Sequence, residues 1–345
     1  MPKKVLIAMS GGVDSSCAAM KLLDEGYELL GATLSLYHEN GVGNECDDAK
    51  AVAKKLGFEH ETVEMKQYFC DTVIKDFVDS YRNGETPNPC IVCNKKVKFG
   101  KLLDYAVEKG CDYIATGHYA QVIRLENGRY ALKKAEDLTK DQTYVLYHLT
   151  QHQLSHLILP LGNETKANLR HRAEEAGLVN ANKPDSQDIC FVPDGDYAAF
   201  LERYTGEKFV PGNMVDKDGN ILAAHSGIEK YTIGQRKGLG VSFGRVRFVT
   251  GKNAERNEIV IGDAEDLMKS ELFARDVNFM TIEKLTEPMR VYAKTRYSQK
   301  EQPATVYPEG ERVRVVFDEP QRAITPGQAV VFYDGDVLVG GGTII

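Results

Sequence analysis

The 345-residue chain lacks any long apolar run. Its strongest apolar stretches, such as residues 5–9, fall far short of the roughly 20 residues that a membrane-spanning helix needs. The N-terminus also lacks the apolar region of a signal peptide. We therefore expect a cytoplasmic protein without a membrane partner. With 42% hydrophobic residues, the chain is long enough to bury a sizeable core.

The chain also lacks an excess of positive charge and the paired cysteines of a disulfide framework. The formal net charge of −7 argues against a protein that coats nucleic acid indiscriminately. Local basic stretches at residues 95–101, 230–247 and 290–300 are nevertheless compatible with a nucleic-acid substrate. Seven irregularly spaced cysteines do not form the paired framework of a small secreted domain. In a reducing cytosol they are thiols, free for catalysis, persulfide chemistry or metal binding, although a buried cysteine is more often only a small apolar side chain.

Two patterns follow one another along the chain. Residues 1–196 alternate apolar strand-like runs with amphipathic helical ones, which predicts a parallel sheet covered by helices on both faces. The expected strands are 5–9, 29–36 and 113–116, and the expected helices are 15–25, 47–56 and 98–108. Short β-branched runs separated by turns then predict a β-rich domain over 197–268 and a barrel or sandwich over 269–345. The predicted fold is α/β, followed by two small β-rich domains.

The first expected strand leads directly into Ser-Gly-Gly-Val-Asp-Ser-Ser at residues 10–16. Two glycines let the backbone turn tightly, so that amide N–H groups point at an anion held by the positive end of the following helix. Asp14 is suited to hold a magnesium ion that bridges phosphates. The lysine of a Walker loop is absent. The motif instead resembles the PP-loop of the ATP pyrophosphatase superfamily, and a turn without a ligand is the alternative.

Ligands of open parallel sheets bind beyond the carboxyl ends of the strands. Residues 115–119, Ala-Thr-Gly-His-Tyr, end an expected strand, so that Gly117 would let backbone approach a nucleotide, while His118 is as readily a structural histidine. Leu34 lies near the end of the second expected strand, where members of this superfamily often pack the adenine. The resemblance implies an ATP site made of Ala8, Met9, Ser10, Gly11, Gly12, Val13, Asp14, Ser15, Leu34 and Gly117.

A Cys-x-x-Cys pair lies within Thr-Pro-Asn-Pro-Cys-Ile-Val-Cys-Asn at residues 86–94. Each proline fixes its own φ and restrains the preceding residue, which predicts a stiff turn carrying Cys90 and Cys93. Such a pair is a redox couple, half of a zinc site or part of an iron–sulfur site, and the second pair that a four-cysteine zinc site needs is missing. Nearby lysines favour the thiolate form. Cys190, within Asp-Ser-Gln-Asp-Ile-Cys-Phe, taken alone is most simply a buried residue at the start of a strand.

These motifs occur in one order with Lys-Asp-Gln at 140–142, Tyr-Thr-Ile-Gly-Gln-Arg-Lys-Gly-Leu-Gly at 231–240 and Thr-Pro-Gly-Gln at 325–328. Together they resemble the tRNA-specific 2-thiouridylase (MnmA) family over nearly the whole chain. The resemblance implies that ATP adenylates O2 of the wobble uracil, that a persulfide on Cys190 attacks C2, and that Cys93 releases the sulfur by forming a disulfide with Cys190. It also implies a persulfide donor, either a sulfur-relay protein or a cysteine desulfurase. The implied contacts to the target base and tRNA are Asn88, Pro89, Cys90, Lys140, Asp141, Gln142, Arg296 and Tyr297.

The chain departs from the family pattern in two places. Many members have aspartate where this chain has Cys90, which leaves three cysteines, Cys90, Cys93 and Cys190, able to hold a four-iron cluster as an alternative to the persulfide route. The segment 37–46 is shorter than expected and Ser298 stands where arginine is common, and both bear on tRNA affinity. Two further alternatives are another PP-loop ligase, which needs no paired cysteines, and a non-enzymatic tRNA-binding or iron–sulfur protein.

Overall fold

The computed structural model describes residues 2–38, 45–181 and 189–345. Its N-terminal part is built on a five-stranded parallel sheet with strand order β3-β2-β1-β4-β7. Nearly continuous apolar runs form the inner strands, because both faces of the sheet are covered. The α/β prediction is confirmed for this part. The strands are β1 (Lys4–Ala8), β2 (Glu28–Ser35), β3 (Glu59–Glu64), β4 (Tyr113–Ala115) and β7 (Leu157–Ile158).

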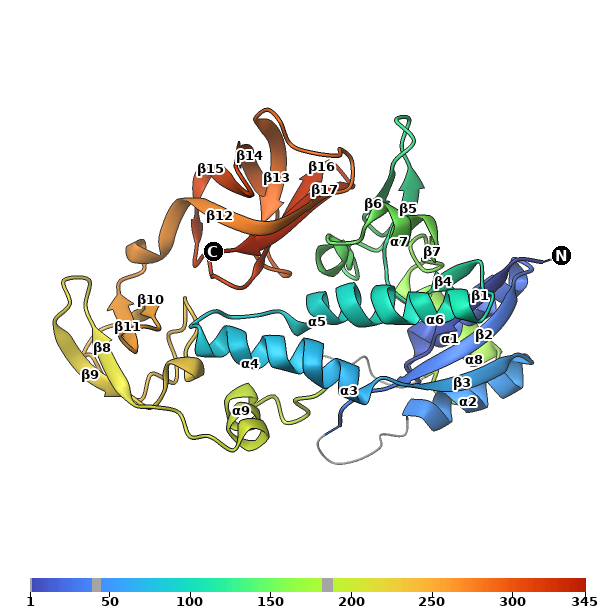
Figure 1. Cartoon of the computed structure of the whole chain (residues 1–345), viewed down its shortest axis with the longest axis horizontal. Helices are drawn as coiled ribbons and strands as arrows, with labels where there is room; N and C mark the ends of the chain where they lie inside the picture. The colour runs from blue at the N-terminus through green and yellow to red at the C-terminus, as the bar shows by residue number, and fades with distance from the viewer. Residues whose placement is uncertain (1, 39–44, 182–188) are drawn as a thin grey trace.

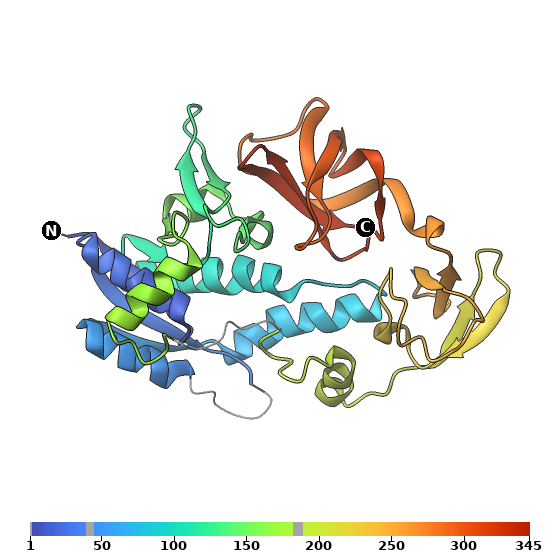
Figure 2. The ribbon, with the colours of Figure 1, turned by 180° about the vertical axis from the view of Figure 1, so that it is seen from behind.

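Helices cover the two faces of this sheet through separate buried clusters. The face seen in Figure 2 packs against α1 (Val13–Asp24), α2 (Glu45–Leu56) and α8 (Lys166–Glu175). The opposite face packs against α6 (Leu102–Glu108), with α7 (Gln151–Ser155) and the 3-10 helix η3 (Thr143–Leu146) beside it. None of the helices in the described parts is long and apolar enough to cross a membrane.

Two long helical segments run side by side from the sheet toward the domain formed by residues 197–268 (Figure 1). One segment joins α3 (Lys66–Phe69), the π-helix η1 (Cys70–Ile74) and α4 (Lys75–Arg82). The other joins α5 (Pro89–Val92), the π-helix η2 (Cys93–Lys101) and α6. The sequence predicts a helix only from residue 98, so this helical hairpin is an addition to the expected fold.

The middle domain begins with a helix that the sequence analysis does not predict. In α9 (Tyr197–Thr205), Asp196 caps the start by accepting the N–H of Ala199, and Gly206 ends the helix with φ of 71°. A four-stranded sheet of order β10-β11-β8-β9 follows, with a turn at residues 218–220 between β8 and β9. Its elements are β8 (Gly212–Val215), β9 (Ile221–His225), η4 (Ile228–Lys230), β10 (Phe248–Asn253), β11 (Glu258–Gly262) and η5 (Glu265–Leu267).

The C-terminal part is a six-stranded antiparallel barrel, which β12 and β17 close by pairing with each other. β17 also pairs with β6 (Tyr130–Lys133), which forms a hairpin with β5 (Gln121–Arg124) in the N-terminal part. The barrel therefore shares a sheet with the N-terminal domain. Its strands are β12 (Met268–Phe279), β13 (Met289–Lys294), β14 (Gln302–Glu309), β15 (Arg312–Arg322), β16 (Ala329–Asp334) and β17 (Val337–Ile344).

Candidate active site

The loop at residues 10–16 connects β1 to α1, in the position that the sequence predicts. Gly11 has φ of 68° and Gly12 caps α1. The Ser15 hydroxyl accepts the N–H of Ser10 at 3.2 Å and donates to the Gly12 carbonyl at 3.1 Å. The side-chain amide of Asn180, which follows α8 in the chain, donates to the Gly11 carbonyl at 3.0 Å. The loop is thus held at the positive end of α1, where a phosphate binds favourably.

The carboxylate of Asp14 faces two donors from distant parts of the chain. Its Oδ1 accepts a hydrogen bond from the Tyr119 hydroxyl at 2.6 Å and from the Lys166 ammonium at 2.6 Å. Lys166 is buried at the start of α8. No local pattern in the sequence marks this lysine as a site residue, because 152 residues separate it from Asp14. Lys166 supplies a positive charge beside a loop that lacks the Walker lysine.

The remaining candidates for ATP contact lie along the same edge of the sheet. Ala8 ends β1, and the buried Met9 donates its N–H to the Ala32 carbonyl at 2.8 Å. Val13 is buried in the first turn of α1. Leu34 is half-buried near the end of β2, as expected, and packs against the helical hairpin through two buried clusters.

Gly117 follows β4 and lies directly against the loop. A Cβ atom there would stand 2.8 Å from the backbone nitrogen of Ser15 and 2.9 Å from the carbonyl carbon of Asp14. Because Gly117 has no side chain, the backbone of Asp14 and Ser15 can pack directly against it. The neighbouring His118 is buried, with Nδ1 2.7 Å from the Thr116 hydroxyl. Burial, helped by the charge of Lys98, holds the pKa of His118 well below its usual value, so its ring is neutral.

The cysteine pair lies on a helix, so the predicted stiff turn is wrong. Asn88 caps α5 by accepting the N–H of Cys90 at 3.2 Å, and Pro89 is the first helical residue. Asparagine followed by proline is a typical helix start, because the amide caps a free N–H and proline has none to satisfy. Cys90 is exposed, whereas Cys93, the first residue of η2, is buried.

Burial raises the pKa of the Cys93 thiol, while Lys98 lowers it and Cys90 raises it further. Residues five apart lie close together on a π-helix, whose hydrogen bonds join residues i and i+5. This spacing brings half-buried Lys98 to the side of η2 that carries Cys93. Since the same ammonium also acts on His118, Lys98 lies in electrostatic reach of both the cysteine and the end of β4.

Cys190 is exposed and lies in a turn, which corrects the expectation of a buried residue at the start of a strand. The next residue, Phe191, is buried edge-on against Phe69 and Phe77, with ring centroids 5.6 and 5.3 Å apart. Cys93 belongs to the same buried cluster as Phe191. The structure therefore brings the surroundings of the two cysteines together. The motif residues 185–188 before Cys190 and residues 39–44 of the short segment lie outside the described residues.

The described residues do not contain a ready-made metal site. Among residues 2–38, 45–181 and 189–345 no disulfide joins any of the cysteines, and no three histidine, cysteine or acidic side chains are grouped to hold a metal ion. Cys90, Cys93 and Cys190 therefore do not fit an iron–sulfur cluster in this arrangement. Asp14 fits magnesium better, since that ion needs only one or two carboxylates besides substrate phosphates.

The expected tRNA contacts at residues 140–142 are tied into the protein. Asp141 accepts the N–H of Ala135 at 3.1 Å, and burial raises the pKa of its carboxyl group. Gln142 accepts the N–H of Tyr119 at 2.9 Å, next to the ATP loop. Lys140 is half-exposed. This segment supports the loop, and its contact with tRNA stays a prediction.

Arg296 and Tyr297 likewise bind other parts of the chain. Nη2 of Arg296 donates to the carbonyls of Ile233 and Ala323, both at 3.1 Å, and to the Thr325 hydroxyl at 3.0 Å. Arg296 therefore joins the middle domain to the barrel. Tyr297 is exposed, and its hydroxyl donates to the Asp141 carbonyl at 2.9 Å. Contact of either residue with tRNA also stays a prediction.

Three family models match successive parts of the chain. They are described as the tRNA methyl transferase HUP domain over residues 3–194, the tRNA methyl transferase PRC-barrel domain over 198–263 and the Aminomethyltransferase beta-barrel domain over 269–344. Among solved structures, the U34-tRNA thiolase NcsA from Methanococcus maripaludis has a TM-score of 0.37 and 22% identity, covering 59% of this chain and 66% of its own. That similarity is remote.

Full-length relatives are much closer. The tRNA-specific 2-thiouridylase MnmA of Acetivibrio thermocellus is 52% identical over 99% of this chain and 99% of its own, and that of Clostridioides difficile is 51% identical over 100% and 98%. The domain descriptions mention methyl transfer, but these relatives match the chain from end to end. The chain belongs to the tRNA-specific 2-thiouridylase (MnmA) family.

Proposed function

We propose that this chain uses ATP to replace O2 of the wobble uridine of tRNA with sulfur. One observation carries the proposal: buried Cys93 and Phe191, the neighbour of exposed Cys190, belong to a single apolar cluster, against which Leu34 packs from near the end of β2. The sheet that carries the loop of residues 10–16 and two thiols of different exposure are therefore connected through one cluster, which supports a shared site. Activation by ATP followed by sulfur transfer requires this combination.

In the first step, uracil O2 attacks the α-phosphorus of ATP and the bond to the β-phosphate breaks, which releases pyrophosphate. The amide groups of residues 10–16 and the Lys166 ammonium stabilise the negative charge of the phosphates. Magnesium held through Asp14 supplies further neutralisation when bound. Because Asp14 binds Lys166 in the free protein, we expect ATP to redistribute these contacts between carboxylate, ammonium and phosphate.

In the second step, the terminal sulfur of a persulfide on Cys190 attacks C2 of the adenylated base, and AMP leaves with the former O2. The Cys93 thiolate then attacks Sγ of Cys190. The sulfur–sulfur bond to the transferred atom breaks, that sulfur stays on C2 as a thiocarbonyl, and a Cys93–Cys190 disulfide forms. An external thiol reductant restores both cysteines, and a persulfide donor reloads Cys190.

The two cysteines are suited to different tasks. Cys190 is exposed, which allows a donor protein to load it, whereas burial of Cys93 protects that thiol from the donor and from oxidants. Burial also raises the pKa of Cys93, and the charge of the half-buried Lys98 opposes this effect.

The test is a single-turnover assay with unmodified tRNA, ATP and a persulfide donor, followed by quantification of 2-thiouridine and AMP. We expect both products in equal amounts, loss of 2-thiouridine in Cys93→Ala and Cys190→Ala, and normal turnover in the control Cys46→Ala. AMP formation that needs no tRNA would point to a small-molecule ligase. Methylated tRNA in place of 2-thiouridine would support the domain descriptions instead.

A further inference from the structure

The barrel holds the peptide that leads into the cysteine helix. The N–H of Thr86 donates to the Pro326 carbonyl at 2.9 Å. The side-chain amide of Gln328 donates to the Thr86 carbonyl at 2.7 Å and to the Pro87 carbonyl at 3.4 Å. Both partners come from the turn at residues 325–328. This turn therefore satisfies the backbone immediately before Asn88, the cap of α5.

The contact between the turn and this peptide is close. Gly327 has φ of 88°, and a Cβ atom there would stand 2.8 Å from the Thr86 nitrogen and 2.9 Å from Cβ of Glu85. Only glycine fits both the conformation and the space. Beside it, Arg275 of β12 forms an ion pair with Glu85 at 3.2 Å. Two barrel segments thus hold residues 85–87.

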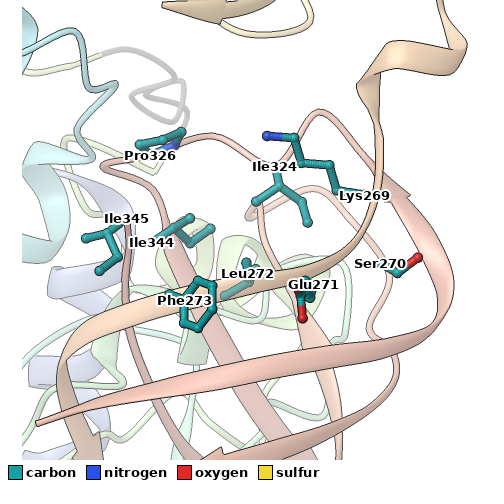
Figure 3. A pocket seen from close by; sticks show the side chains of 9 residues that line it. All are labelled: Lys269, Ser270, Glu271, Leu272, Phe273, Ile324, Pro326, Ile344 and Ile345. Atoms are coloured by element: carbon teal, nitrogen blue, oxygen red, sulfur yellow. The ribbon is translucent and has the colours of Figure 1, made fainter. Parts of the chain in front are cut away.

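Backbone hydrogen bonds anchor the turn at residues 325–328 in the barrel. Backbone bonds at 2.9 and 2.8 Å tie Gly327 and Gln328 to Ile344 at the end of β17. On its other side, Pro326 lines a pocket of about 440 Å³ together with Ile344 and Ile345, as Figure 3 shows. Within this turn, the Gln328 side chain makes the hydrogen bonds to the N-terminal domain.

We propose that Gln328 is a positioning residue for sulfur transfer. By fixing the carbonyls of Thr86 and Pro87, it fixes the start of α5 and hence the placement of Cys90 and Cys93. The prolines at 87 and 89 make this stretch stiff, so a shift at Thr86 reaches the helix without being absorbed. This inference rests on the proposed function, since the step it serves is the attack by Cys93.

The test compares Gln328→Ala with Gln321→Ala. The control glutamine is a buried barrel residue, whereas Gln328 is half-buried, and the amide of Gln321 donates within the barrel to the Glu319 carbonyl at 2.8 Å. We expect Gln328→Ala to lower the single-turnover rate of thiolation by about tenfold or more, with unchanged KM for ATP and tRNA, because small displacements of reacting groups are costly. Gln328→Glu, which has no amide donor, should behave in the same way.

A second measurement needs no substrate and separates this inference from the proposed function. Amide hydrogen exchange at residues 90–94 should become faster in Gln328→Ala but not in Gln321→Ala, at similar melting temperatures. Faster exchange without any thiolation by the wild-type enzyme would keep the positioning role and reject the function. Unchanged exchange, or a thiolation rate equal to that of Gln321→Ala, would overturn the inference.

Discussion

Asp14 is the residue on which ATP chemistry depends most directly. We expect Asp14→Asn to reduce AMP formation below about a tenth of the wild-type rate, because the loop loses its carboxylate for magnesium and its partner for Lys166. The unfolding temperature should fall only modestly, because the substituted amide oxygen lacks the charge but can still accept hydrogen bonds from Tyr119 and from the buried Lys166. Asp24→Asn on the same helix removes a pair with Arg172 and serves as the control. AMP formation above that level would remove Asp14 from the site.

Lys98 acts on the thiol chemistry through its charge. Burial raises the pKa of Cys93 and Lys98 counteracts it, so the thiolate fraction and the thiolation rate should rise with pH. In Lys98→Gln the pH profile of Cys93 alkylation should move to higher pH. Lys101 is exposed on the same π-helix, and Lys101→Gln should leave this profile unchanged. The measurement is alkylation of Cys93 against pH, resolved by mass spectrometry. Coinciding profiles for the two variants would contradict this role.

His148 links stability to pH. It is buried, neither ring nitrogen has a hydrogen-bond partner within the described parts of the chain, and burial lowers its pKa from 6.5 to about 3, with Lys95 adding to the effect. Because the folded pKa lies below the unfolded one, the stabilising contribution is complete above pH 6.5 and is lost as pH falls toward 3.

His148→Phe should therefore flatten the acid side of the stability profile. Urea unfolding between pH 7 and pH 4 is the measurement, with the exposed His152→Phe on α7 as the control. We expect the stability of the wild type relative to that of His148→Phe to fall steadily as the pH is lowered. A constant difference across this range would show that His148 is not buried in its neutral form.

Among the elements, the ATP loop is the one that sequence reasoning recovers most fully. An apolar strand, a glycine turn and an amphipathic helix are all local patterns, and each appears within a residue or two of its expected bounds. The helix from Lys66 to Arg82 is missed, although Phe69, Val73, Phe77 and Tyr81 recur every fourth residue and are all buried. The π-helices have no comparable signal, because their widened turns arise from packing rather than from local propensity.

A substitution at Cys90 tests the role of the continuous helical segment α5–η2, which carries both cysteines of the pair. In the first turn of α5, an aspartate gains from the positive end of the helix, so Cys90→Asp should fold normally. Since the described cysteines form no cluster site, we expect this variant to keep substantial thiolation activity when assayed with a persulfide donor without oxygen. Cys93→Ala is the inactive control. Joint loss of iron, colour and thiolation in Cys90→Asp, with ATP binding preserved, would establish an iron–sulfur route.

At the scale of the whole molecule, the sequence predicts the kinds of domain but not how they are joined. Strand periodicity and turns are local, and they predict the barrel correctly. The pairing of Leu132 with Leu338, which continues the barrel into the N-terminal domain, depends on residues far apart in the chain. The same holds for the place of Arg296 between two domains, because its partners Ile233 and Ala323 are far from it in the chain; the tRNA contact that the family resemblance implies for Arg296 stays a prediction.

Arg296→Ala should therefore act first on stability. The variant loses three hydrogen bonds from one charged nitrogen and leaves the Ile233 and Ala323 carbonyls without this donor, which should lower the unfolding free energy by about 2–3 kcal/mol. Arg290→Ala, which removes a surface pair with Asp318 in the same barrel, should change it much less. Thermal unfolding of both variants is the measurement, with tRNA affinity determined at several salt concentrations beside it. An unchanged melting temperature together with a salt slope lower by about one phosphate contact would instead assign Arg296 to the tRNA surface.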